Sequence, residues 1–151
     1  MQLIIITGLS GSGKSVALKA LEDSAYYTAD NLPAGLLPAM VDFLQSAGYP
    51  RSAVSIDARS GDTLSQLPRQ VGDLKTRGVD VRVLFLDAKT DTLIKRFSET
   101  RRRHPLSGDE LTVAECITRE REILSDIGGL SHHIDTSELN PNALRAWIKE
   151  F

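Results

Sequence analysis

Eight residues close to the first methionine, Gly8 to Ser15, have the types and the spacing of a phosphate-binding loop. They read GLSGSGKS and fit the pattern G-x-x-x-x-G-K-[ST]. Glycines let a backbone wrap closely around a phosphate, because they lack a Cβ and tolerate positive φ. The amides of such a loop face an anion at a helix start, where the helix dipole also favours negative charge. The pattern therefore predicts a P-loop that holds phosphate groups.

The loop residues have distinct expected roles. Lys14 is expected to reach the β- and γ-phosphates as a catalytic residue, and the Ser15 hydroxyl to ligate Mg²⁺. The alternative is a glycine-rich turn between a strand and a helix. An apolar run at 3–6 and a run of good helix formers at 16–22 favour the P-loop. We expect phosphate contacts from all eight residues, which are Gly8, Leu9, Ser10, Gly11, Ser12, Gly13, Lys14 and Ser15.

Four carboxylates follow apolar stretches that read as strands, and ligands of open α/β sheets bind beyond strand ends. Asp57 suits a catalytic role, holding Mg²⁺ opposite Ser15, and its alternative is a turn residue. Asp30 is expected either to orient an acceptor hydroxyl, as in P-loop kinases, or to form an Asx turn. Asp87 favours a loop or capping role, and Asp135 is expected in a loop near the base.

The strongest run of positive charge has three interpretations. It can be a lid whose arginines close over phosphates, a solvated helix end, or a docking patch for RNA or protein. The lid interpretation places Arg101 and Arg102 on the nucleotide. The run comprises Lys95, Arg96, Arg101, Arg102, Arg103 and His104.

Five apolar stretches alternate with amphipathic segments and predict one α/β domain over residues 1–151. We expect a five-stranded parallel sheet with helices on both faces and the strand order 2-3-1-4-5 of nucleotide kinases. The second strand is expected at 25–29, and the helix after it is delayed or kinked by Pro38. That helix is expected to bury Leu36, Leu37, Met40, Val41 and Leu44.

Composition limits the classes of function. The 151 residues carry a formal net charge of −2, which gives no global argument for binding nucleic acid or a membrane surface. No stretch approaches the length of an apolar membrane span. Cys116 is the single cysteine, so an internal disulfide is impossible and a reducing cytoplasm is expected.

Six segments together resemble one family, and the similarity covers essentially the whole chain. They are GLSGSGKSVALKALED, ADNLP, SIDARS, LFLDA, TRRRHPL and IDTSEL. The chain is similar to the N-terminal domain of the RapZ/YvcJ family of bacterial P-loop proteins. The resemblance implies binding of ATP and GTP, with weak hydrolysis at most. It also implies a second nucleotide-contacting segment formed by Asp57, Ala58, Arg59 and Ser60.

The resemblance further implies an RNase adapter. In enterobacterial members, the full-length protein binds small regulatory RNAs and presents one of them to an endoribonuclease. Family proteins carry a second domain that is associated with RNA and sugar-phosphate binding and with oligomerisation. We therefore expect an isolated nucleotide-binding regulatory domain. Two alternatives stay open, a small-molecule kinase that uses Asp30 and direct RNA binding through residues 101–104.

Overall fold

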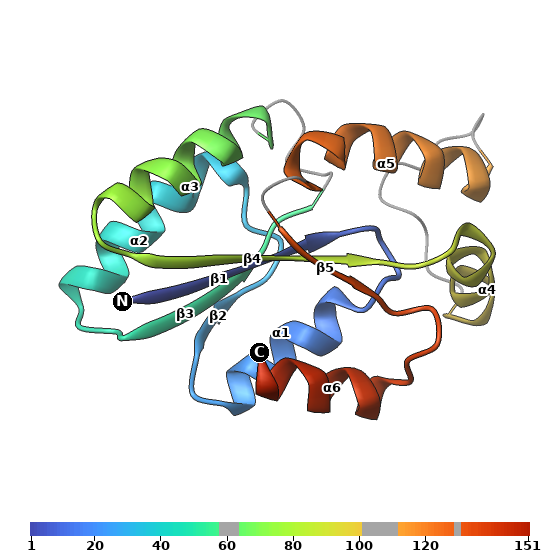
Figure 1. The fold of residues 1–151 in the computed structure, drawn as a ribbon, viewed down its shortest axis with the longest axis horizontal. Coiled ribbons are helices and arrows are strands. Elements are labelled where there is room, and N and C mark those ends of the chain that lie inside the picture. Colours follow the sequence, from blue (N-terminus) through green and yellow to red (C-terminus); the bar gives the residue numbers. More distant parts are fainter. Residues whose placement is uncertain (58–63, 101–111, 129–130) are drawn as a thin grey trace.

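The computed structural model describes residues 1–57, 64–100, 112–128 and 131–151 (Figure 1). Strands and helices alternate along nearly the whole chain. In chain order the elements are β1 (Gln2–Gly8), α1 (Lys14–Asp23), β2 (Tyr27–Ala29), a 3₁₀ turn (Ala34–Leu36), α2 (Leu37–Ser46), β3 (Arg51–Ser55), α3 (Leu67–Thr76), β4 (Asp80–Asp87), α4 (Thr90–Thr100), α5 (Val113–Gly128), β5 (His132–Asp135) and α6 (Pro141–Glu150).

The five strands form one parallel sheet in the order β2-β3-β1-β4-β5, which confirms the predicted order. β1 is central, with Ile6 opposite Ser55 of β3 on one side and Leu84 of β4 on the other. Because all the strands run the same way, their carboxyl ends share one edge of the sheet. The loop after β1 and the residues that follow β3, β4 and β5 therefore lie along this edge.

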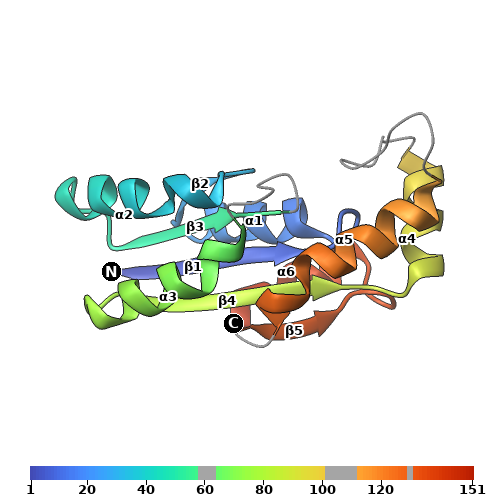
Figure 2. The same cartoon turned by 90° about the horizontal axis from the view of Figure 1, so that it is seen from above.

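Helices cover both faces of the sheet. α2, α3 and α5 lie on one face, and α1 and α6 lie on the other (Figures 1 and 2). The apolar run of β1 is continuous because successive side chains point to opposite faces of the sheet, and helices cover both faces. Leu3 and Ile5 join the core under the first group of helices, and Ile4 and Ile6 join the core under the second.

The helix after β2 begins later than its apolar pattern suggests. Leu36 ends the 3₁₀ turn and is 54% exposed, so the prediction that it is buried was wrong. Pro38 lies in the first turn of α2, where its missing N–H would have no helical partner. Leu37, Val41 and Leu44 are buried as expected. Pro38 thus delays the helix and does not kink it.

The second strand is shorter than predicted. It begins at Tyr27, two residues after the expected start at Ala25. The N–H of Ala25 donates to the Glu22 carbonyl at 3.1 Å, and Ala25 has φ 71°. Ala25 therefore belongs to the turn that ends α1, which an alanine-and-tyrosine pattern does not reveal.

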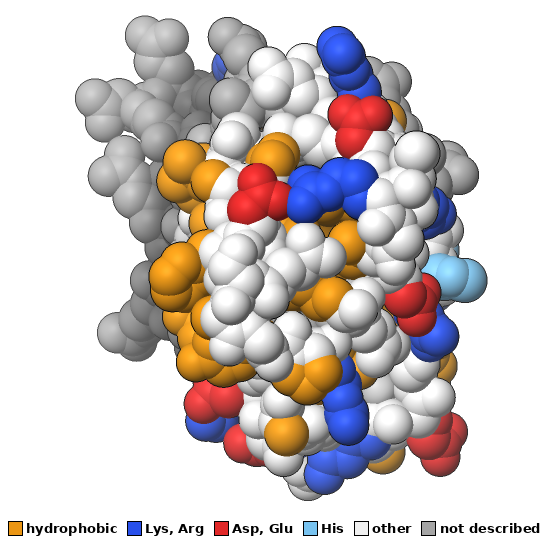
Figure 3. Space-filling view, turned by 90° about the vertical axis from the view of Figure 1, so that its left-hand side faces the viewer, with side chains coloured by type: hydrophobic (Ala, Val, Ile, Leu, Met, Phe, Trp, Pro, Cys, Tyr) orange, Lys and Arg blue, Asp and Glu red, His pale blue; other side chains and the backbone are white. Residues whose placement is uncertain are grey.

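The end of the sheet opposite the β1–α1 loop carries mixed charge. Basic and acidic side chains alternate there, and apolar side chains gather along one margin (Figure 3). Arg77 pairs with Asp42, and Arg82 with Asp80. This end therefore offers no field of a single sign among its described residues. No helix in the described ranges combines the length and the apolar character needed to span a membrane.

Candidate phosphate-binding site

The predicted P-loop connects β1 to α1 and begins where the backbone is crowded. Gly8 has φ 134°, and a Cβ at this position would lie 2.1 Å from the carbonyl oxygen of Leu86 on β4. The next residue, Leu9, donates its N–H to that same oxygen at 3.1 Å. Gly8 is therefore needed both for its conformation and for the close approach of β4.

The middle of the loop is a tight turn. The N–H of Ser12 donates to the carbonyl of Leu9 at 3.1 Å, and the Ser12 hydroxyl donates to the same oxygen at 2.5 Å. Gly11, the third residue of this turn, has φ 84°, as a type II turn requires. The alternation of glycine and serine therefore builds a particular backbone shape.

Lys14 and Ser15 begin α1 at the end of the loop. The Lys14 ammonium donates to the carbonyl of Gly8 at 3.0 Å, so the side chain folds back across the loop to its first residue. Ser15 is exposed and lies in the first turn of α1. A cation and a helix N-terminus thus meet at one place, an arrangement that attracts phosphate.

The second half of the loop is held from outside by two side chains. Thr136, directly after β5, donates its hydroxyl to the carbonyl of Ser12 at 2.6 Å. Arg96 of α4 donates to the carbonyl of Gly11 at 2.9 Å and also to the carbonyl of Thr136. All the described peptide bonds are trans, which puts the N–H of each peptide opposite its C=O. The Gly13 N–H therefore points away from Thr136, toward the inside of the loop.

Arg96 belongs to the basic run for which the sequence left a lid, a helix end and a docking patch open, and its guanidinium contacts the loop and the turn after β5. Its guanidinium also donates to the Thr136 hydroxyl at 3.1 Å. Arg96 therefore joins the P-loop to the turn after β5. The residue type alone could not distinguish Arg96 from the other basic residues near it in the sequence.

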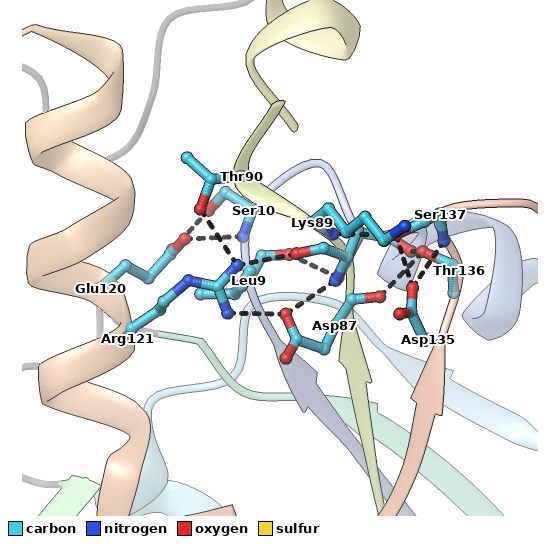
Figure 4. A network of polar contacts seen from close by, with 12 residues as sticks. Leu9, Ser10, Asp87, Lys89, Thr90, Glu120, Arg121, Asp135, Thr136 and Ser137 are labelled. Carbon is cyan, nitrogen blue, oxygen red and sulfur yellow. Dashed lines mark hydrogen bonds and ion pairs between the residues drawn. The ribbon is translucent and has the colours of Figure 1, made fainter. Parts of the chain in front are cut away.

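Glu120 holds the first half of the loop, and the sequence analysis did not predict it. Its carboxylate accepts the N–H and the hydroxyl of Ser10 at 2.8 and 2.6 Å (Figure 4). The residue lies on α5 and is 0% exposed. One signal could have found it: Glu120 falls three residues after Ile117 and four before Leu124, within the apolar stripe of the helix.

Asp57 lies two residues beyond β3, which pairs directly with β1. Ser55 is opposite Ile6, so continuing the register places Asp57 beside Gly8 at the start of the loop. Asp57 is 3% exposed. A carboxylate and the Ser15 hydroxyl are oxygen donors of the kind that Mg²⁺ prefers, so these two residues fit the ion chemically. Their role as ligands stays a prediction.

Asp30 lies in a turn at the carboxyl end of β2. It accepts a hydrogen bond from the Ser55 hydroxyl, which in turn accepts the N–H of Asn31 at 2.7 Å. Asn31 has φ 54°, and the N–H of Leu32 donates to the Ser55 carbonyl at 2.9 Å. Asp30 is exposed. An Asx turn would need the Leu32 N–H to donate to the Asp30 side chain, and that N–H donates to Ser55 instead, so the turn is not of the predicted type. A role of Asp30 toward an acceptor hydroxyl stays a prediction.

The other two strand-end carboxylates organise loops. Asp87 accepts from the Ala88 N–H at 2.7 Å and from Arg121 of α5 at 2.8 Å, in agreement with the predicted loop role. Asp135 accepts the N–H of Ser137 at 2.8 Å and its hydroxyl at 2.5 Å (Figure 4). These two bonds from Ser137 lower the pKa of Asp135 below its ordinary value.

Several predicted contacts lie outside the described residues. In the second predicted segment, Asp57 is described, whereas Ala58, Arg59 and Ser60 are not. The two arginines of the predicted lid, Arg101 and Arg102, also lie outside the described residues.

Comparison with known proteins now identifies the family. The sequence model of the RapZ-like N-terminal domain matches residues 1–151. The chain belongs to the RapZ-like N-terminal domain family. This confirms the resemblance carried by the P-loop, the DNLP segment and the RRRHPL segment.

Relatives of this RapZ-like domain share more than half of its residues. A nucleotide-binding protein of Chromobacterium violaceum is 59% identical over 150 residues, which are 99% of this chain and 54% of the relative. A nucleotide-binding protein of Aromatoleum aromaticum is 57% identical over 151 residues, covering 100% of this chain and 52% of the relative. The chain thus spans about half the length of the curated relatives it matches.

Solved structures share the fold at low identity. The tunicamycin resistance protein of Deinococcus radiodurans superposes with a TM-score of 0.63 at 19% identity, covering 99% of this chain and 94% of that one. A shikimate kinase of Bacteroides thetaiotaomicron gives 0.59 at 11% identity, covering 98% and 94%. At these identities the likeness shows a P-loop kinase-like fold for the RapZ-like domain.

Proposed function

We propose that this RapZ-like domain binds ATP or GTP with Mg²⁺ at the loop of residues 8–15 and serves as the regulatory nucleotide-binding part of an RNase adapter. The observation that carries the proposal is the shape of the loop. Thr136 holds the Ser12 carbonyl outward, and Lys14 folds over the loop's first residue. An inward-facing amide and a cation at a helix start suit a polyphosphate.

The chain's own residues divide the work. Backbone amides of the loop and the start of α1 bind the phosphates, and the Lys14 ammonium neutralises charge on the β- and γ-phosphates. Ser15 and Asp57 would hold Mg²⁺, which would supply positive charge to neutralise the phosphates. The turn of Asp135 to Ser137 joins the loop through Thr136, and we place the base beside it.

We expect slow hydrolysis. Water attack needs a base with an available lone pair near the γ-phosphate. Asp30 and Asp87 at the rim are already engaged as acceptors, because they receive hydrogen bonds from Ser55 and Arg121. This supports a domain that senses a nucleotide more than one that consumes it.

The adapter part of the proposal rests on the family. Full-length relatives extend to about twice this length, and we assign contacts with a small regulatory RNA, an endoribonuclease and other subunits to the full-length protein. We place that protein in the cytoplasm.

Calorimetry with Mg-ATP and Mg-GTP tests the binding. The wild-type domain should bind at least one of them, and Lys14→Ala should lose most of the affinity, because the phosphates lose their cation. Lys19→Ala is the matched control, since Lys19 lies on the exposed side of the same helix and pairs with Glu22. Absence of binding by the wild type, or equal affinity in the Lys14 variant, overturns the proposal.

A small-molecule kinase is the second candidate, and the exposed Asp30 at the carboxyl end of β2 favours it. It predicts that some metabolite accelerates ADP release above the water background. The acceleration should disappear in Asp30→Asn, in which the amide keeps the bond from Ser55 without the charge. A metabolite screen without any such acceptor would remove this candidate.

A further inference from the structure

The two hydrogen bonds between Glu120 and Ser10 require a carboxylate to be buried, and burial of a carboxylate costs free energy. Glu120 is fully buried, and a carboxylate withdrawn from water is expensive unless hydrogen bonds compensate it. Both oxygens accept from Ser10, one from the N–H and one from the hydroxyl. On the same helix, Ile117 and Leu124 are also fully buried, so an apolar side chain would suit the position. The carboxylate therefore has a task that apolar packing cannot perform.

That task concerns the orientation of one peptide. The N–H of Ser10 points to Glu120, so the carbonyl of the same peptide, that of Leu9, points the opposite way. There the Leu9 carbonyl accepts from the N–H and the hydroxyl of Ser12 and closes the turn. Fixing the Ser10 N–H therefore fixes the turn on which the rest of the loop is built.

α5 has anchors of its own. It packs into the core through Ile117, Leu124 and Ile127. The residue after Glu120, Arg121, donates to Asp87 at 2.8 Å and to the Ala88 carbonyl at 2.7 Å, which joins α5 to the end of β4 (Figure 4). The carboxylate that holds Ser10 is therefore carried by a helix that is attached to the core and to the sheet.

We propose that Glu120 is a positioning residue for nucleotide binding, which holds Ser10 so that the loop has its phosphate-accepting shape before the nucleotide arrives. This inference rests on the proposed function of the same loop. The advantage is preorganisation, since a loop ordered in advance loses less conformational entropy when its ligand binds.

Geometry and charge can be separated by substitution. In Glu120→Gln, the amide oxygen can accept the Ser10 N–H, and the NH₂ can donate to the Ser10 hydroxyl after the hydroxyl rotates. The geometry is kept while the charge is lost, so the affinity for Mg-ATP or Mg-GTP should stay within about threefold of wild type or rise. Glu120→Ala loses both bonds and should weaken the affinity by about tenfold or more.

Two controls separate positioning from general damage. Glu122→Gln removes a charge from an exposed residue of the same helix and should leave the affinity unchanged. Leu124→Ala opens a cavity under the same helix and should lower the melting temperature without weakening the affinity in proportion. An affinity loss in Leu124→Ala as large as that in Glu120→Ala at equal loss of stability would overturn the inference.

Hydrogen exchange without nucleotide gives a second readout that does not depend on binding. Amides in a peptide covering residues 1–18 should exchange faster in Glu120→Ala, while Glu120→Gln and Leu124→Ala should resemble wild type. Unchanged exchange in Glu120→Ala overturns the inference, as does faster exchange with unchanged affinity. If exchange responds as expected but the wild type binds no nucleotide, the proposed function fails while the preshaping of the loop by Glu120 stands.

Discussion

The hydroxyl of Thr136 donates a 2.6 Å hydrogen bond to the carbonyl of Ser12, so the turn after the edge strand β5 supports the loop after the central strand β1. Thr136 is 1% exposed and also receives two hydrogen bonds from Arg96. Arg96 of α4 thus joins the loop and the β5–α6 turn in one hydrogen-bonded unit.

Removal of the Thr136 hydroxyl should weaken the binding of phosphate. Thr136→Val keeps the shape of the side chain but leaves the Ser12 carbonyl without this donor. We expect a cost of about 1–2 kcal/mol in unfolding free energy, measured by urea denaturation. We also expect about tenfold weaker binding of Mg-ATP or Mg-GTP in calorimetry. Thr136→Ser keeps the hydroxyl and should restore the affinity; a serine variant as weak as the valine variant would contradict the role of this bond.

Substitution of Gly8 should be far more harmful than substitution of a glycine in open space. A Cβ at Gly8 would lie 2.1 Å from the Leu86 carbonyl oxygen, which is backbone and cannot swing aside. Gly8→Ala should therefore cost several kcal/mol in unfolding free energy, or prevent folding. Gly48→Ala is the matched control, since φ is 81° there but no atom lies within 4 Å. It should cost about 1 kcal/mol in the same urea denaturation. Equal costs at the two positions would show that the backbone of β4 shifts to make room for the added Cβ.

Local patterns explain what the sequence could predict. The apolar run of β1, the spacing of the loop and the alternation of strands and helices are each encoded within about ten neighbouring residues. They were enough to predict the five strands, whereas the strand order was expected by analogy with nucleotide kinases. Leu36 was misplaced because a helical stripe does not reveal that a 3₁₀ turn precedes Pro38.

Local patterns could not predict the two residues that hold the loop, Glu120 and Thr136. Glu120 is 110 residues from Ser10, and Thr136 is 124 residues from Ser12. No spacing rule joins positions so far apart, and their side-chain types are common on any surface. The acidic residue within the apolar stripe of α5 was a usable signal for burial. It could not, however, indicate which hydrogen-bond donor would meet the carboxylate.

The stability of the domain should decrease in acid partly through Asp135. Hydrogen bonds from the hydroxyl and the N–H of Ser137 lower its folded-state pKa below its ordinary value. A depressed carboxyl pKa adds stability above the unfolded pKa, and that stability is lost as the pH falls through the folded value. Melting temperatures measured from pH 6 to pH 3 should fall less steeply in Ser137→Ala than in wild type. The difference between the two proteins should shrink toward the acid end and leave a constant offset, because the Lys89 N–H also loses the Ser137 hydroxyl as its acceptor. Parallel curves would mean that Ser137 does not stabilise the carboxylate.

Magnesium removal should distinguish Asp57 from the other acidic residues. If Asp57 and Ser15 hold the ion, wild type should bind ATP or GTP more tightly with Mg²⁺ than with EDTA. Asp57→Asn should lose most of that difference, by about tenfold, because an amide oxygen is a weaker ligand than a carboxylate. Its affinity in EDTA should stay close to that of wild type, which rules out simple distortion of this buried position. Asp73→Asn, an exposed carboxylate of α3, serves as the matched control and should keep the full magnesium effect. A full magnesium effect in Asp57→Asn would move the ion's protein ligand elsewhere on the rim of the sheet.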